Sequence, residues 1–233
     1  MSDFRTPYPV WVPQCAPMSK DERITRGMKS QLGDRRRALA RDDGALGWKL
    51  GFGVPAAMEK LGIDAPLVGH LLQSGRLESG AVVDISNWDN PKLEPEIVAR
   101  VGEDGEISAI GAAIELADLD PGAGDPEAIL AANIFQRHVL LGPVTEGAST
   151  GDVALRVAVN GEEVAASDDV TEATGDLAGL VRHVAKTLKA AGESLERGDM
   201  VICGSIVPAL DVAPGDEVEV SLAPLGSLTV SFE

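Results

Sequence analysis

Hydrophobic residues recur with a helical period in four stretches of the chain. In residues 21–41 the apolar side chains fall near one stripe among many Arg and Lys, which predicts an amphipathic helix. Residues 55–62 predict one or two helical turns, residues 126–140 a short helix, and residues 177–188 a clear amphipathic helix. The apolar positions of the first and last helices are Ile24, Met28, Leu32 and Leu39, and Leu177, Leu180, Val181, Val184 and Leu188.

From about residue 67 onward the dominant period is two, which is typical of β-strands. The expected strands are 81–86, 93–101, 109–119, 152–161 and 162–168, followed by three more in the C-terminal part of the chain. Asn160 and Gly161 between two of these strands predict a type I′ hairpin turn. An earlier short strand is expected around Lys49, which has glycines on both sides. The chain is therefore rich in strands.

The order of these elements predicts one β-rich α+β domain with a short helical N-terminal region. No internal repeat and no Gly- or Ser-rich linker divides the chain. We expect residues 1–66 to form an N-terminal arm and helical region packed on the core. Residues 67–233 are expected to form the main β-rich domain, so that the whole chain is a single structural unit.

Composition excludes several classes of function. The net charge of −17 would repel a phosphate backbone, and aromatic residues, at 3%, are too few to stack on bases. The two cysteines, Cys15 and Cys203, form neither a disulfide framework nor a zinc motif. No signal peptide and no apolar run of about 20 residues is visible. We expect a cytoplasmic protein that binds neither nucleic acid nor membrane.

Two acidic residues lie on one face of an expected strand. Glu94 and Glu96 are two positions apart in KLEPEIVARV, so their carboxylates repel each other unless water or a cation lies between them. Bulk water is the simpler interpretation, because similar pairs occur elsewhere: Asp104/Glu106, Asp118/Asp120, Asp125/Glu127 and Glu217/Glu219. Glu115 differs, because it lies between Ile114 and Leu116 and needs a partner if it is buried. Three converging carboxylates would suit a hard cation such as Mg²⁺ or Mn²⁺.

The chain resembles the 2-keto-4-pentenoate hydratase / 4-oxalocrotonate decarboxylase family, which is part of the fumarylacetoacetate hydrolase superfamily. The motifs GWKLGF, LEPEI, AIELAD and GDMVICGS…PGDEVEV…LGSLTVSF occur in the family's order over about residues 25–232. The resemblance implies a mixed β-roll or sandwich that holds Mg²⁺ or Mn²⁺ on Glu94, Glu96 and Glu115. It also implies that Lys49 is the active-site lysine. A surface lysine with its charged end in water is the ordinary alternative for Lys49.

The implied activity is that of a metal-dependent lyase, a hydratase or decarboxylase, acting on a small 2-oxo or 2-hydroxydienoic acid through a metal-chelated enolate. Alternatives within the superfamily are a C–C hydrolase of acylpyruvates, another decarboxylase or a tautomerase. A non-catalytic subunit of a lyase complex is a third possibility. The family's common assembly implies a homo-oligomer.

The sequence departs from the family's pattern around the expected pocket. Leu67 stands where hydratases of this group have an acidic residue, and Gln136 stands among larger residues that replace small polar ones after Asn133. We expect His70 and Gln136 to supply the replacement acid–base or anion-binding groups, with Arg137 and His138 as further candidates. For each histidine, an ordinary surface or hydrogen-bonded role is the alternative.

Overall fold

The computed structural model describes residues 21–120 and 122–233, so the expected N-terminal arm lies outside the described residues. The described chain forms an eight-stranded sheet in the order β2-β1-β10-β5-β6-β7-β3, with β11 paired to β5, and a five-stranded sheet in the order β4-β13-β12-β8-β9. The larger sheet contains β1 (Ala45–Gly51), β2 (Leu67–Leu72), β3 (Arg76–Leu77), β5 (Pro91–Val101), β6 (Ile107–Asp118), β7 (Gln136–Glu146), β10 (Met200–Ser205) and β11 (Leu210–Asp211). The smaller sheet contains β4 (Ala81–Val83), β8 (Ala154–Val159), β9 (Glu162–Ser167), β12 (Glu217–Ala223) and β13 (Gly226–Phe232).

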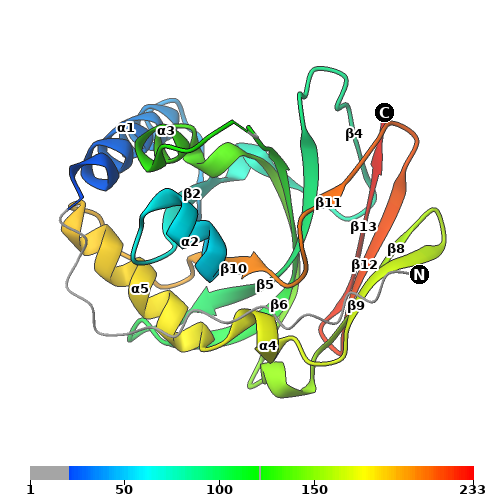
Figure 1. Cartoon of the computed structure of the whole chain (residues 1–233). Coiled ribbons are helices and arrows are strands. Elements are labelled where there is room, and N and C mark those ends of the chain that lie inside the picture. The colour runs from blue at the N-terminus through cyan, green and yellow to red at the C-terminus, as the bar shows by residue number, and fades with distance from the viewer. Residues whose placement is uncertain (1–20, 121) are drawn as a thin grey trace.

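The larger sheet curls into a roll, with helices on one side and the smaller sheet on the other (Figure 1). The helices are α1 (Glu22–Leu39), α2 (Pro55–Leu61), α3 (Pro126–Ala131), α4 (Thr171–Thr174) and α5 (Leu177–Ala190), with short 3₁₀ turns at Gln73–Gly75, Asn133–Phe135 and Thr150–Asp152. The expected mixed β-roll with short helices in the N-terminal region is confirmed.

The two faces of the larger sheet pack against different groups. Trp48 and Ile97, on the outer face, belong to a large apolar cluster that includes residues of α1, α5 and the smaller sheet. The inner face carries a small separate cluster of Leu46, Leu71, Val98, Ala113, Val139, Leu141 and Ile202. Lys49 pairs with Ile202, and Ile202 pairs with Val98, so these three side chains lie on the inner face. Glu96, two positions before Val98, lies on it too.

The helices begin and pack as their sequences indicate. The side chain of Asp21 caps α1 by accepting a hydrogen bond from the backbone N–H of Arg23 at 2.9 Å. Gly27 lets α1 approach α3 closely, because a Cβ at Gly27 would lie 2.7 Å from the Cβ of Leu130. The buried positions of α5 are Leu177, Gly179, Leu180, Val181, Val184 and Leu188, which confirms the expected amphipathic helix.

The helix expected over residues 126–140 is wrong in its second half. The helical part, α3, ends at Ala131, and Asn133, Ile134 and Phe135 have φ values of 49°, 54° and 64°. Left-handed backbone cannot continue a right-handed helix. From Gln136 the chain pairs with β6 as strand β7. Pairing with a buried neighbour strand therefore overrides the local helical pattern.

The remaining strand expectations are confirmed within a few residues at their ends. Asn160 and Gly161 have φ values of 53° and 81°, as a type I′ turn requires. The division at residue 66 stays a prediction. Strand β1 lies before that boundary, yet it pairs with both β2 and β10 inside the larger sheet.

Candidate metal centre and active site

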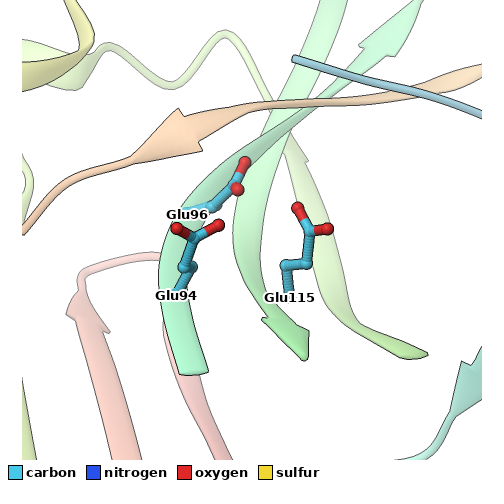
Figure 2. A group of neighbouring side chains, drawn as sticks. All are labelled: Glu94, Glu96 and Glu115. Carbon is cyan, nitrogen blue, oxygen red and sulfur yellow. The ribbon is translucent and has the colours of Figure 1, made fainter. Parts of the chain in front are cut away.

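The three glutamates singled out in the sequence meet on the inner face of the roll. Glu94 lies directly opposite Glu115 in the antiparallel pairing of β5 and β6, and Glu96 is two positions further along β5. One carboxylate oxygen from each residue lies within 4.8 Å of the others. Figure 2 shows the three carboxyl groups grouped around one space, two from β5 and one from β6. Strand pairing thus brings together residues about 20 positions apart in the sequence.

These carboxylates do not form a solvated face. Glu96 and Glu115 are 0% exposed, and Glu94 is partly buried. Glu96 Oε2 accepts a hydrogen bond from the backbone N–H of Gly204 at 2.7 Å. Glu96 Oε1 and Glu115 Oε2 are buried and accept no hydrogen bond from any donor among the described residues. Buried carboxylate oxygens without donors are costly, so a divalent cation fits this donor set.

The pKa values of the carboxyl groups reflect this crowding. Burial raises the pKa of Glu94 to about 7, with the charge of Glu115 adding to the effect. The pKa of Glu96 is raised well above its usual range by burial and then by the charges of Glu115 and Glu94. Burial also raises the pKa of Glu115, although Lys49 acts in the opposite direction. Without a cation, burial and mutual repulsion therefore favour the protonated forms of these carboxyl groups.

Lys49 is the one ammonium group at this site among the described residues. Its side chain is 2% exposed, and Nζ donates a hydrogen bond to Glu115 Oε1 and lies 3.5 Å from the carbonyl oxygen of Ile134. Gly69 on β2 makes room for it, because a Cβ there would lie 2.9 Å from Lys49 Cγ. The surface alternative for Lys49 is therefore wrong.

The Ile134 carbonyl reaches Lys49 from a strained turn. A positive φ at a β-branched residue such as Ile134, 54° here, is rare and costs energy. Asn133 ties this turn to β2: its Oδ1 accepts from the backbone N–H of His70 at 2.8 Å, and its Nδ2 donates to the His70 carbonyl at 2.9 Å. The sequence resemblance singled out Asn133, and these two hydrogen bonds give it a structural role.

The structure does not bring the His70 side chain to the carboxylates. His70 pairs with Trp48, so its ring lies on the outer face of the sheet. There its Nδ1 lies 3.2 Å from Oε1 of Gln31 on α1. Burial lowers the pKa of His70 to about 4, which keeps the ring neutral. These contacts do not support the expected catalytic role, and the ordinary role of a hydrogen-bonded core histidine fits them.

Gln136 begins β7, opposite Ala117 of β6. Its Oε1 lies 3.5 Å from Nδ2 of Asn133, and its Nε2 is buried without a hydrogen-bond partner among the described residues. It therefore lies near the turn that contacts Lys49, and its role in catalysis stays a proposal. Arg137 and His138 point elsewhere: Arg137 pairs with Asp118 at 2.8 Å, and His138 stacks on Trp88.

A cleft of about 180 Å³ leads to Glu94 from the ends of β1 and β10. It is lined by Leu50, Gly51, Phe52, Gly53, Val54, Pro66, Glu94, Ala173, Thr174, Leu180, Cys203, Gly204, Ser205, Ile206, Val207, Pro208 and Ala209. Sequence reasoning did not assign residues 204–209 or 173–174 to the site. The Gly-Ser that ends β10 was one available signal, because the Gly204 N–H holds Glu96.

Comparison with known proteins gives the site a family. The family model described as "Fumarylacetoacetate (FAA) hydrolase C-terminal" matches residues 64–233. A 4-oxalocrotonate decarboxylase from Pseudomonas sp. strain CF600 is 28% identical over 217 residues, which cover 85% of this chain and 81% of that protein. A 2-keto-4-pentenoate hydratase from Paraburkholderia xenovorans is 24% identical over 208 residues, covering 81% of this chain and 76% of that protein.

The fold of a solved relative agrees over most of the chain. The 4-oxalocrotonate decarboxylase from Pseudomonas putida G7, complexed with magnesium and adipate, superposes with a TM-score of 0.78 at 25% identity, covering 87% of this chain and 83% of that chain. A second structure of that enzyme, complexed with calcium and acetate, gives a TM-score of 0.77 at 26% identity and the same coverage. The family model spans well over half of the present sequence, and the chain therefore belongs to the fumarylacetoacetate hydrolase family.

Proposed function

We propose that the protein is a divalent-metal-dependent lyase that removes CO₂ from a conjugated 2-oxo dicarboxylic acid of the 4-oxalocrotonate type. Relatives named as decarboxylases and as hydratases both support a lyase. The observation that favours decarboxylation is the chemistry of the cleft. Among the described residues that line it, Glu94 is the one with a carboxyl group, and none is Arg, Lys or His.

Glu94, Glu96 and Glu115 would hold the metal, with Mg²⁺ or Mn²⁺ as the ion. The bound cation would supply Lewis-acid stabilisation of negative charge on the substrate's 2-oxygen. The backbone N–H of Gly204 fixes the orientation of Glu96, and Lys49 holds that of Glu115. These contacts pre-organise the carboxylates, which limits the rearrangement needed on binding.

Decarboxylation of such a substrate requires fewer acid–base groups than hydration. When the terminal C–C bond breaks, its electron pair moves along the conjugated chain to the 2-oxygen, which then takes one proton. Adding water requires in addition a base to activate the water and an acid to protonate a carbon. Leu67 stands where hydratases of this group have an acid. It is 3% exposed, begins β2 and lies opposite Gly51 of β1. Since Glu94 would be occupied as a metal ligand, Lys49 would be the one proton-transfer group at the described site, and hydration needs two.

Lys49 is the group placed to manage the proton. Its Nζ donates to Glu115, and its ammonium is the one positive charge beside the three carboxylates among the described residues. In this position it can donate a hydrogen bond to a substrate oxygen and return a proton to the 2-oxygen as CO₂ leaves. Gln136, near the same turn, would hydrogen-bond the substrate through its unpartnered Nε2.

Hydration stays the second candidate, because hydratases are among the relatives. The experiment is to supply the purified protein with Mg²⁺ or Mn²⁺ and 4-oxalocrotonate, and to measure released CO₂ and the 2-hydroxydienoate product. A parallel assay supplies 2-hydroxypenta-2,4-dienoate and follows the loss of its conjugated absorbance. CO₂ release without dienoate consumption supports the proposal. Dienoate hydration without CO₂ release would replace it by the hydratase.

We further infer a cytoplasmic homo-oligomer in which each chain forms a single structural unit. The described helices include none that combines the length and the apolar character of a membrane span. The acidic net charge of −17 is unsuited to nucleic acid as a partner. Light scattering during size-exclusion chromatography measures the oligomeric state directly, and a monomer at micromolar concentration would contradict this part of the proposal.

A further inference from the structure

The cleft that begins at Glu94 is apolar along most of its length. Its walls include Phe52, Val54, Leu180 and Val207, and no Arg, Lys or His of the described chain lines it. A substrate whose 2-oxo acid end lay at the three carboxylates would extend its other end into this cleft, because Glu94 belongs to both. The chemistry of the cleft therefore acts on the far end of the substrate.

The few polar side chains in the cleft have already donated their hydrogens. The pairs are Ser205 Oγ with Val207 O at 2.6 Å, Thr174 Oγ1 with Val170 O at 3.0 Å, and Cys203 Sγ with Val201 O at 3.4 Å. Two backbone N–H groups of the same loop are also bonded: Gly204 N with Glu96 Oε2 at 2.7 Å and Ile206 N with Pro95 O at 2.9 Å. These five donors are therefore not available to hydrogen-bond a charged end of the substrate.

We propose that this cleft receives the terminal carboxylate of the substrate and removes its water without replacing it by cationic partners. The inference rests on the proposed decarboxylase function and extends it. An ionised carboxylate is destabilised in an apolar site that offers it no cationic partner among the described residues. In the transition state the negative charge has moved to the 2-oxygen, so the cleft destabilises the ground state more than the transition state.

The step balances without a further reactant. The bond between the terminal carboxylate and the adjacent chain carbon breaks, and neutral CO₂ leaves the cleft. The electron pair of that bond shifts along the conjugated chain to the 2-oxygen, which takes one proton. An apolar cleft suits a neutral CO₂ better than it suits the carboxylate from which CO₂ forms.

Two probes of equal length separate this proposal from its opposite, in which the cleft binds the terminal carboxylate favourably. 2-Oxoadipate ends in a carboxylate, 2-oxohexanoate ends in a methyl group, and neither has the conjugation needed to react. Calorimetric titration of the Mg²⁺-loaded wild-type protein should give 2-oxohexanoate the tighter binding, by about tenfold or more, because the unpaired carboxylate loses its water. Equal or tighter binding of 2-oxoadipate would overturn the proposal.

A charged variant at the wall provides the kinetic arm. Val207→Arg places a cation in the cleft, and Val207→Met is the length-matched neutral control at the same partly buried loop position. Val207→Arg should tighten 2-oxoadipate by about tenfold or more and lower kcat on 4-oxalocrotonate. Val207→Met measures how much of either change comes from the larger side chain alone, and it should not tighten 2-oxoadipate. A raised kcat in Val207→Arg would overturn the proposal.

The CO₂ measurement tests the decarboxylase function, and the binding measurement tests the role of the cleft. Failure of the wild-type protein to release CO₂ from 4-oxalocrotonate would sink the decarboxylase function, whatever the probes show. Release of CO₂ together with preferred binding of 2-oxoadipate would keep that function and reject the apolar cleft as its device.

Discussion

Lys49 and Glu115 form a fully buried ion pair across the inside of the roll, with Nζ of Lys49 donating to Oε1 of Glu115. The two residues come from β1 and β6, which are separated in the larger sheet by β10 and β5. One ammonium group therefore faces three carboxyl groups, and it does not balance their charge. This imbalance is the physical reason for expecting a divalent cation, and it determines how variants of the site should behave.

Lys49→Met should lower kcat by about 100-fold or more, because the charge-assisted hydrogen-bond donor and proton source is lost while the methionine preserves most of the packing. Mg²⁺ affinity should stay the same or increase, since Glu115 no longer has a competing cation. Steady-state kinetics and calorimetric titration with Mg²⁺ measure the two effects. Lys60→Met, at an exposed position of α2, is the matched control and should leave both unchanged. Undiminished turnover in Lys49→Met would make the residue structural.

Glu96→Gln should weaken Mg²⁺ binding by more than the roughly 10–100-fold that loss of an outer hydrogen bond costs, because a buried ligand oxygen and its charge are both removed. The amide oxygen can still accept from the Gly204 N–H, so the fold should survive. In the absence of metal the variant should unfold at a higher urea concentration than the wild type. Glu219→Gln, on the exposed side of β12, is the control with the same chemistry. Equal Mg²⁺ affinity in the two variants would exclude Glu96 as a ligand.

The metal-free protein should lose stability as the pH rises from about 4.5 to 7. The folded-state pKa of Glu94 is raised from 4.5 to about 7, and that of Glu96 is raised well above its usual range, both chiefly by burial. In this pH window the folded state therefore holds more protons than the unfolded state. For each proton that the folded state holds in excess, the free energy of unfolding falls by up to ~1.4 kcal/mol for every unit by which the pH rises.

Urea denaturation in EDTA at several pH values measures this slope, and the same series with Mg²⁺ should be flatter and more stable. Glu96→Gln should also flatten the metal-free slope. A metal-free stability slope that is the same in Glu96→Gln as in the wild type would contradict the proposed carboxylate cluster.

His70 should produce the opposite trend over an overlapping pH range, from about 4 to 6.5. Burial depresses its folded-state pKa from 6.5 to about 4, so its contribution to stability is present above 6.5 and is lost as the pH falls toward 4. The full contribution corresponds to about 3 kcal/mol. His70→Asn keeps a donor where Nδ1 faces Gln31 and removes the titration. The stability difference between the two proteins should therefore narrow or reverse between pH 6.5 and 4, with catalysis at pH 7.5 little changed. A loss of turnover without loss of stability would restore His70 as a catalytic candidate.

The sequence was sufficient to predict the helices and strands with a strong hydrophobic period. It also pointed to the acidic residues whose burial would cost free energy without a partner. Glu94 and Glu96 share a face by the pleat of a single strand, so their proximity needed only strand periodicity. Glu115 joined them through a cross-strand register, which a sequence pattern suggests but does not fix. The resemblance to the family implied Glu115 as the third ligand without giving the pairing of the two strands.

The sequence failed where tertiary contacts overrule local preference. The apolar residues after Asn133 suit a helix, but β6 needs a partner strand, and three successive left-handed residues redirect the chain into β7. The position of His70 away from the carboxylates has a related reason. Successive residues of a strand face opposite sides of the sheet. Gly69 therefore lies on the inner face beside Lys49, and His70 lies on the outer face beside Gln31.

Gly69 should tolerate no side chain, although its backbone conformation is ordinary. A Cβ at this position would lie 2.9 Å from Lys49 Cγ and 3.0 Å from Asn133 Oδ1, so Gly69→Ala must displace the lysine, the strained turn, or both. We expect a stability loss of about 1–3 kcal/mol, as for other overpacked positions, together with a fall in kcat of about tenfold or more, because the proton donor shifts from its place. Gly142→Ala on β7 is the matched control, since its Cβ would approach only Ala112, with the nearest atom at 3.2 Å. It should lose a similar or smaller amount of stability and keep full turnover. Thermal unfolding and kinetics on the same preparations compare the two. A Gly69→Ala enzyme as active as the wild type would show that the position of Lys49 does not limit the reaction.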